Sequence, residues 1–183
     1  QKQTSNFQIL KDVHVCLQTY QIRMKTSTSV ITALLCLFLK TVRGQCPSGW
    51  TRHGNSCYHF SHDKEDWPNA QFICNALGGY LTEINSNEEG QFLENQSRLF
   101  HNIDDQFWVG ASDLLVEGEW MWMTTNTRVS TQLIHWAAGN PSNSNSNENC
   151  MTFINDGTWN DAPCSFLFHY TCEKEDGEPQ VVG

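Results

Sequence analysis

The chain has 183 residues and a formal net charge of −9 at pH 7, from 11 Lys and Arg against 20 Asp and Glu. This length predicts one domain, with room for a short tail. Nucleic acids and anionic membrane surfaces bind proteins through clusters of Lys and Arg, and because the mature sequence has no such cluster, neither is expected as a partner.

The first 44 residues are predicted to lie outside the mature protein. Lys25 follows Met24, and a mainly apolar run, VITALLCLFL, occupies 30–39. This pattern, with small residues before Gln45, predicts a secretory signal peptide at 24–44 and leaves 1–23 as an upstream extension. The alternative is a membrane anchor, but the run is well short of the ~20 residues that span a bilayer. We therefore expect a secreted, extracellular protein without a membrane span.

The mature chain is strongly acidic. From residue 45 onward it contains 5 basic and 19 acidic residues, a net charge of −14. Such a charge favours cations as partners, although acidity also keeps secreted proteins soluble without any specific ligand.

Six of the eight cysteines belong to the mature chain. In a secreted domain this number predicts three disulfides, and the count alone leaves about fifteen pairings open. A zinc site is the competing interpretation, and the absence of any Cys-x-x-Cys pair argues against it. Turn residues between Cys46 and Cys57 predict a short hairpin over 46–60.

A helix is predicted after the hairpin, over 65–79. Asp66 suits the N-cap, Pro68 suits the first turn, and Gly78 with the glycine after it ends the helix. The apolar residues that recur at helical spacing are Phe72, Ile73, Ala76 and Leu77.

A short strand is predicted at 80–84 and a second helix at 86–99. Ser86 and Glu89 form a capping-box pattern at the start of this helix. The helix also contains the only N-glycosylation sequon of the mature chain, at Asn95.

The second half of the chain is richer in strands. Apolar, β-prone segments predict strands at 106–112, 119–123, 150–154 and 168–173. Between them, 129–149 has no clear periodicity, and such a segment within a compact domain is typically functional or disordered. The tail, 175–183, is polar. Two early helices and a strand-rich second half predict an α+β fold.

Four short motifs resemble those of the C-type lectin domain family. The FWVG at 107–110 is similar to the family's apolar core motif, and the WND at 159–161 to its calcium-binding strand. Asn140-Pro141-Ser142 stands where the family has a proline between two oxygen-bearing residues, and Glu148 precedes Cys150 by two positions. Together with the cysteines, these motifs identify 45–174 as a member of the family, similar to short secreted single-domain invertebrate lectins.

The resemblance implies a fold and a disulfide pattern. The fold has two helices, small antiparallel sheets and a long calcium-binding loop. The implied disulfides are Cys46–Cys57, which marks the long form with an N-terminal hairpin, Cys74–Cys172, and Cys150–Cys164. The last of these would hold the Asn- and Ser-rich stretch 139–149 beside the WND strand.

The resemblance also implies a Ca²⁺ site in this loop. Ca²⁺ takes about six to eight oxygen ligands. The Asn140–Pro141 bond is expected to be cis, which turns the flanking side chains toward one point. Glycan and calcium binding are expected to be coupled, because the same side chains would hydrogen-bond two sugar hydroxyls. These residues are Asn140, Ser142, Glu148, Asn160 and Asp161.

The implied site departs from the family's pattern. Sugar-binding members usually place an acid and an amide around the proline, Glu with Asn in mannose-type sites and Gln with Asp in galactose-type sites, whereas Asn140 and Ser142 are both neutral. Glu148 and Asp161 are the two remaining carboxylates, so we expect weak Ca²⁺ binding, ~10⁻⁴–10⁻³ M. Because Asn and Ser both donate and accept hydrogen bonds, the sugar class is left open.

A second calcium site is suggested by the same resemblance. Asp113 and Glu117 match two ligands of the family's auxiliary site, whose other acidic positions are occupied here by Asn143 and Asn149. The alternative is that these residues belong to a solvated loop.

Catalysis is not expected, because no nucleophile motif is present and the disulfides account for the mature cysteines. The leading hypothesis is a secreted calcium-dependent lectin that recognises exposed glycans, with microbial targets and innate defence inferred from family analogy. The alternatives are an acidic extracellular or shell-matrix protein that binds mineral calcium, and a protein-binding module without sugar binding. Since single domains of this kind bind one sugar weakly, a homo-oligomer would add avidity.

Overall fold

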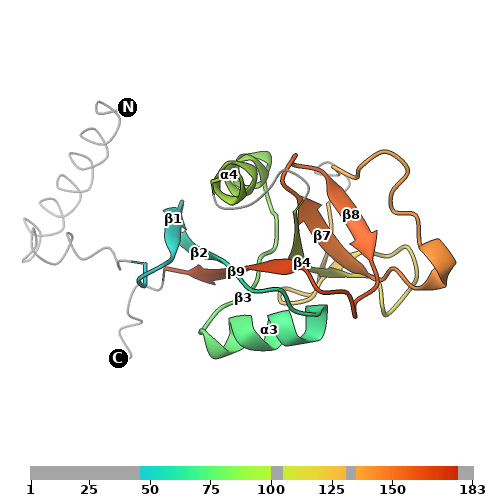
Figure 1. The fold of residues 1–183 in the computed structure, drawn as a ribbon, viewed down its shortest axis with the longest axis horizontal. Helices are drawn as coiled ribbons and strands as arrows, with labels where there is room; N and C mark the ends of the chain where they lie inside the picture. The colour runs from blue at the N-terminus through green and yellow to red at the C-terminus, as the bar shows by residue number, and fades with distance from the viewer. Residues whose placement is uncertain (1–45, 100–104, 131–134, 177–183) are drawn as a thin grey trace, which may run out of the picture. The chain divides into compact units, whose positions relative to one another are not determined.

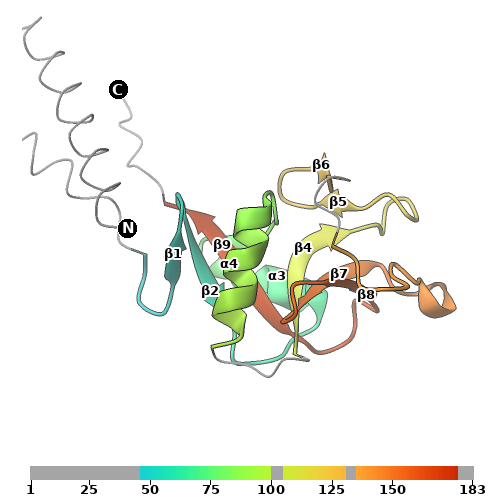
Figure 2. The same ribbon diagram turned by 90° about the horizontal axis from the view of Figure 1, so that it is seen from above.

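The structure is a computed structural model that describes residues 46–99, 105–130 and 135–176 (Figures 1 and 2). The predicted signal peptide, the upstream extension and most of the polar tail lie outside the described residues. Within these ranges, no helix has both the length and the apolar character needed to cross a bilayer.

The strands confirm the predicted α+β architecture. The main path of the sheet runs through β1 (Thr51–His53), β2 (Ser56–Phe60), β9 (His169–Glu175), β4 (Gln106–Ser112), β5 (Met121–Trp122) and β6 (Thr127–Arg128). Off this path, β3 (Tyr80–Leu81) pairs with β9, and β7 (Cys150–Ile154) pairs with β4 and with β8 (Trp159–Ala162). The β4–β9 pair is parallel and the other strand pairs are antiparallel.

Two helices lie on opposite sides of strands β2 and β9 (Figures 1 and 2). α3 (Trp67–Ala76) begins after Asp66, whose carboxylate accepts a hydrogen bond from the Asn69 N–H at 2.9 Å. α4 (Asn87–Ser97) begins after Ser86, whose Oγ accepts from the Glu89 N–H at 3.1 Å. Both N-caps predicted from the sequence are therefore confirmed.

The buried face of α3 differs from the apolar stripe seen in the sequence. Trp67, Ala70 and Cys74 are buried, whereas Phe72 is 71% exposed and Leu77 is also exposed. The helix is fixed by the Cys74 disulfide and by the Trp67 indole, which donates to a β4 carbonyl at 2.9 Å. These two anchors decide which face meets the sheet, and of the apolar stripe only Ile73 packs against the core.

The core is divided between the two faces of the sheet. Along β4, Phe107 and Val109 belong to one buried cluster and Trp108 to the other, as the two-residue alternation of a strand requires. Leu93 of α4 joins the first cluster and Trp67 of α3 joins the second. The FWVG motif is thus central to both halves of the core.

The three disulfides implied by the family resemblance are present. Cys46–Cys57 closes the β1–β2 hairpin, Cys74–Cys172 joins α3 to β9, and Cys150–Cys164 joins the start of β7 to the segment after β8.

Some predicted strands have different bounds. β3 ends at Leu81 rather than at 84, and β5 covers only Met121–Trp122 of the predicted 119–123. The carboxylate of Glu83 instead accepts hydrogen bonds from the N–H groups of Thr124 and Thr125 at 2.7 and 3.0 Å. β9 continues to Glu175, one residue beyond the predicted domain boundary.

Candidate metal and ligand site

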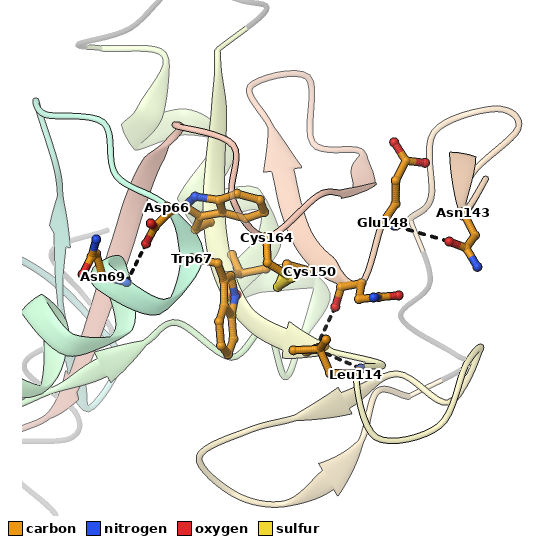
Figure 3. The surroundings of a disulfide bond; sticks show 12 residues. Asp66, Trp67, Asn69, Leu114, Asn143, Glu148, Cys150 and Cys164 are labelled. Atoms are coloured by element: carbon orange, nitrogen blue, oxygen red, sulfur yellow. Dashed lines mark hydrogen bonds between the residues drawn. A yellow bond between two sulfur atoms is a disulfide. The ribbon is translucent and has the colours of Figure 1, made fainter. Parts of the chain in front are cut away.

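The Asn- and Ser-rich loop is firmly attached where it enters β7. The Cys150–Cys164 disulfide holds the first residue of β7 (Figure 3). On the other side, the Asn149 carbonyl accepts hydrogen bonds from Ser112 Oγ at 2.7 Å and from the Asp113 N–H at 3.3 Å. The loop is therefore not a free linker, and its end is fixed against β4.

The N-terminal half of the loop is attached to the WND strand. The Ala137 N–H donates to the Trp159 carbonyl at 2.8 Å, and the Asn140–Pro141 bond is cis, as predicted. The Asn140 Nδ2 donates to the Asn160 Oδ1 at 2.5 Å. Two predicted ligands that are 20 residues apart in sequence thus lie side by side.

Glu148 is held by donors from within the loop. Its Oε2 accepts hydrogen bonds from the Ser142 Oγ and from the Ser144 N–H, both at 2.7 Å. Its own N–H donates to the Asn143 Oδ1 at 3.3 Å (Figure 3). Hydrogen bonds to an ionised group are stronger than neutral ones, so these contacts fix the carboxylate in the loop.

Asp161 is the most buried of the predicted ligands, with 1% of its surface exposed. Its Oδ2 accepts a hydrogen bond from the Asn143 N–H at 2.7 Å, while its Oδ1 is buried without a hydrogen-bond partner. A buried carboxylate oxygen without a partner is costly. A cation at this position would remove that cost.

The structure thus brings the predicted ligands together as hydrogen-bonded pairs. Asn140 contacts Asn160, Ser142 contacts Glu148, and Asp161 is joined to the loop through Asn143. Among the described residues, no three His, Cys, Asp or Glu side chains gather as a metal-binding group. Any cation held here would therefore depend on amide and hydroxyl oxygens as well as on two carboxylates.

The predicted auxiliary site is only partly assembled. Asp113 is 3% exposed; its Oδ2 accepts from the Gly118 N–H at 2.9 Å and its Oδ1 is buried without a partner. Burial raises the pKa of Asp113, and the Asp161 charge adds to this effect, while the Gly118 hydrogen bond opposes it. Asn149 approaches Asp113 through its backbone carbonyl, whereas Glu117 is exposed.

Three groups that shape the site were not predicted from the sequence. The Gln106 Oε1 accepts hydrogen bonds from Thr152 Oγ1 at 2.8 Å and from Asn160 Nδ2 at 3.2 Å, so it orients the Asn160 amide. The only available signal was a polar residue at the head of an apolar strand. The backbone N–H groups of Asn143 and Ser144, which donate to Asp161 and Glu148, cannot be recognised from residue types.

The glycosylation candidate, Asn95, is an exposed residue of α4. Ser97 of the same sequon is buried, and its Oγ donates to the Glu94 carbonyl at 3.1 Å. The asparagine is accessible in the folded domain, and glycosylation at this position stays a prediction.

Residues 63–174 match the protein family described as "Lectin C-type domain". The chain is 34% identical over 122 residues to a Perlucin-like protein of Mytilus galloprovincialis, which covers 66% of this chain and 76% of that protein. It is also 34% identical over 137 residues to C-type lectin domain family 4 member E of Homo sapiens, with 73% of this chain and 60% of that protein covered.

The fold is similar to that of the mouse scavenger receptor C-type lectin carbohydrate-recognition domain. The TM-score is 0.65 at 32% sequence identity, and the match covers 73% of this chain and 98% of that domain. Since the chain spans only 60% of the human relative, the similarity concerns the shared domain rather than that whole protein.

Proposed function

Since the chain belongs to the C-type lectin domain family, we propose that it is a secreted lectin that binds exposed glycans together with Ca²⁺. The proposed site is formed by the loop before β7 and by the WND strand. Microbial surface glycans, and a role in innate defence, are proposed by analogy with the family.

The observation that best supports a cation in this site is the Asp161 side chain. Its Oδ1 is buried without a hydrogen bond, although the Oδ2 of the same carboxylate is satisfied by the Asn143 N–H. Ca²⁺ prefers carboxylate and amide oxygens, and the predicted ligands on the loop and on the WND strand supply both kinds. The donor set therefore fits the metal that the family implies.

The proposed ligands are Asn140, Ser142, Glu148, Asn160 and Asp161. When bound, Ca²⁺ would supply positive charge that attracts two vicinal sugar hydroxyls. Asn140 and Ser142 would exchange their hydrogen bonds to Asn160 and Glu148 for bonds to those hydroxyls, because amides and hydroxyls both donate and accept. The carboxylate of Glu148 would accept a sugar O–H.

Two carboxylates make this a weak site. Ligand charge is one of the factors that sets Ca²⁺ affinity, so we expect dissociation constants of ~10⁻⁴–10⁻³ M, which suits an extracellular protein. We also propose the auxiliary site at Asp113, Glu117, Asn143 and Asn149, supported by the buried, unpartnered Asp113 Oδ1. Weak single sites would favour a homo-oligomer for avidity.

A glycan array tests this proposal directly. The chain is applied in millimolar Ca²⁺ and again with a chelator, beside Asp161→Asn, which keeps the shape of the side chain and removes its charge. We expect glycan signal that the chelator and the variant both abolish. The control is Glu175→Gln, an exposed acid of β9 outside both proposed calcium sites, which should bind as the wild type does.

Retained glycan binding by folded Asp161→Asn would contradict the assigned residues. Silence of the folded wild type in both conditions would contradict the lectin function itself.

The acidity of the mature chain favours a second candidate function, binding to mineral calcium through diffuse charge. The net charge of −14 is spread over the sequence rather than concentrated in one motif. On that hypothesis Asp161→Asn would adsorb to calcium carbonate nearly as well as the wild type, whereas a lectin site would lose its glycan signal with the same substitution.

A further inference from the structure

A pocket outside the proposed calcium site lies between α4 and the turn that joins β7 to β8. Its volume is about 360 Å³, which is within the range of small-molecule sites. One wall is a single stripe of α4, formed by Asn87, Gly90 and Glu94, and the opposite wall is the turn at Asp156 and Gly157. Neither wall takes part in the site proposed above.

The pocket and the proposed calcium site meet at strand β8 of the β7–β8 hairpin. Trp159 lines the pocket, and the next residue, Asn160, is a proposed calcium ligand. Successive side chains of a strand point to opposite faces, so the two side chains belong to different surroundings. Figures 1 and 2 show α4 on the side of the hairpin away from the Ser144–Ser146 turn.

Two glycines shape the pocket in different ways. A Cβ added to Gly90 would meet only the Ile84 Cγ2, at 3.7 Å, so this part of α4 presents open space. Gly157 has a φ of +89°, and a Cβ there would lie 2.8 Å from the Glu94 Oε2. The turn can therefore approach the Glu94 carboxylate because it has no side chain at that point.

The charge of the pocket is negative. Glu88, Glu94 and Asp156 line it, and no Lys or Arg is among the lining residues. Glu94 pairs with Arg98 through its Oε1 at 2.8 Å, and Asp156 accepts from the Thr158 N–H and Oγ1 through its Oδ1. Within the described residues, the second oxygen of each of these two carboxylates has no hydrogen bond, so both can accept from a ligand.

The remaining lining suits a polar ring. Ile84 and Trp159, which are 3% and 2% exposed, contribute a small apolar floor. Amide and hydroxyl side chains surround it, those of Ser86, Asn87, Gln91 and Thr158. The His135 Nε2 donates to the Asn87 Oδ1 at 3.0 Å, which orients the Asn87 amide at the pocket. Carbohydrate rings have the matching combination of one apolar face and a rim of hydroxyls.

We propose that this pocket binds a monosaccharide that carries a free primary ammonium group, a 2-amino-2-deoxyhexose. The ammonium would lie between Glu94 and Asp156, and the ring would lie on the floor. Binding would require neither Ca²⁺ nor the calcium loop, so it does not depend on the function proposed above.

NMR titration of the ¹⁵N-labelled chain tests this site. Glucosamine, N-acetylglucosamine and methylammonium are added separately at matched pH and ionic strength, in the presence of chelator. We expect saturable shifts of the Gly90 and Gly157 amides and of the Trp159 indole with glucosamine, and at least about fivefold weaker effects with the other two probes. Equal shifts with N-acetylglucosamine, equal shifts with methylammonium, or no saturable shift with glucosamine would overturn the proposal.

Variants locate the binding within the pocket. Glu94→Gln combined with Asp156→Asn should weaken glucosamine binding at least about fivefold, because both charges are lost. Gly90→Leu should block the pocket without strain, since its φ is not in the left-handed region. Glu119→Gln combined with Glu175→Gln serves as the charge-matched control outside the pocket. Asp161→Asn serves as the calcium-loop control, and both controls should leave glucosamine binding unchanged. Loss of binding in Asp161→Asn alone would move the ligand to the calcium loop and refute this assignment.

Discussion

Ser142 shows how one side chain sets the charge of the proposed calcium site. Its Oγ donates to the Glu148 carboxylate at 2.7 Å, so Ser142→Asp would place two carboxylates against each other and add a third acid to the site. We expect Ca²⁺ to bind on the order of tenfold more tightly, because the cation relieves that repulsion. Calorimetric titration measures the Ca²⁺ affinity. Ser142→Asn is the control, because asparagine is neutral and has the same size as aspartate.

The two variants separate charge from shape. Ser142→Asn should bind Ca²⁺ within about threefold of the wild type, because the ligand charge is unchanged. If the Asp and Asn variants had the same affinity, the side chain at 142 would not be a ligand.

Single residues also show what the sequence could and could not predict about the site. Glu148, Asn160 and Asp161 were predicted because their residue types and spacing repeat a known motif, and Asn140 because it stands beside the proline of that motif. The backbone N–H of Asn143, which holds Asp161, was not predictable because every non-proline residue has such a donor. The role of Gln106 depends on strand pairing between β4 and β7, which the local sequence does not specify.

At the scale of elements, Gly110 shows how closely β3 and β4 approach. Its N–H donates to the Thr82 carbonyl at 2.8 Å, and a Cβ at this position would lie 2.6 Å from the Leu81 carbonyl oxygen. Since backbone cannot move as a side chain can, we expect Gly110→Ala to lower the free energy of unfolding by about 2–3 kcal/mol. Urea denaturation, followed by tryptophan fluorescence, measures this loss.

Gly90 is the matched control within α4. Its added Cβ meets only a side-chain methyl at 3.7 Å, and alanine is the better helix former, so Gly90→Ala should stabilise the protein by about 0.5–1 kcal/mol. Equal losses of stability in both alanine variants would contradict the packing described for β3 and β4.

Elements with local signals were the most predictable ones. Both helices start at the predicted caps, and β4 and β7 have the predicted bounds, because caps and apolar runs act over a few residues. The 3₁₀ turn at Ser144–Ser146 was not predicted, since it has no apolar periodicity and depends on the hydrogen bonds of Glu148. The exposed Phe72 shows the same limit, because a distant disulfide orients its helix.

At the scale of the whole molecule, Tyr58 connects β2, α4 and β9 in the core. Its Oη lies 2.7 Å from the Glu89 Oε1 and 3.2 Å from the Glu173 Oε1, and all three residues are buried. A tyrosine has one hydroxyl proton, so it can donate to only one of these carboxylates at a time. When Tyr58 donates to Glu89, its contact with Glu173 is favourable if the Glu173 carboxyl is protonated and donates to the Tyr58 Oη.

The same arrangement makes the stability of the domain depend on pH. Burial, together with the Glu89 charge, raises the pKa of Glu173 from 4.5 to about 7, although the hydrogen bonds with Ser56 and Tyr58 oppose the increase. Because folding raises this pKa, protonated Glu173 contributes fully to stability below about pH 4.5, and the contribution is lost as the pH rises through about 7. A shift of this size corresponds to roughly 3 kcal/mol.

Glu173→Gln should therefore flatten the pH dependence of unfolding, because an amide stays neutral at every pH. We expect the wild type to lose stability between about pH 5 and 8, and the variant to lose on the order of 2 kcal/mol less over the same interval. Repulsion within the acidic chain also grows with pH, because its net negative charge increases. Glu175→Gln removes the same charge from an exposed position of the same strand, so its pH profile should run parallel to that of the wild type. If the Glu173→Gln profile also ran parallel, repulsion across the whole molecule, rather than the Glu89–Tyr58–Glu173 cluster, would account for the pH dependence.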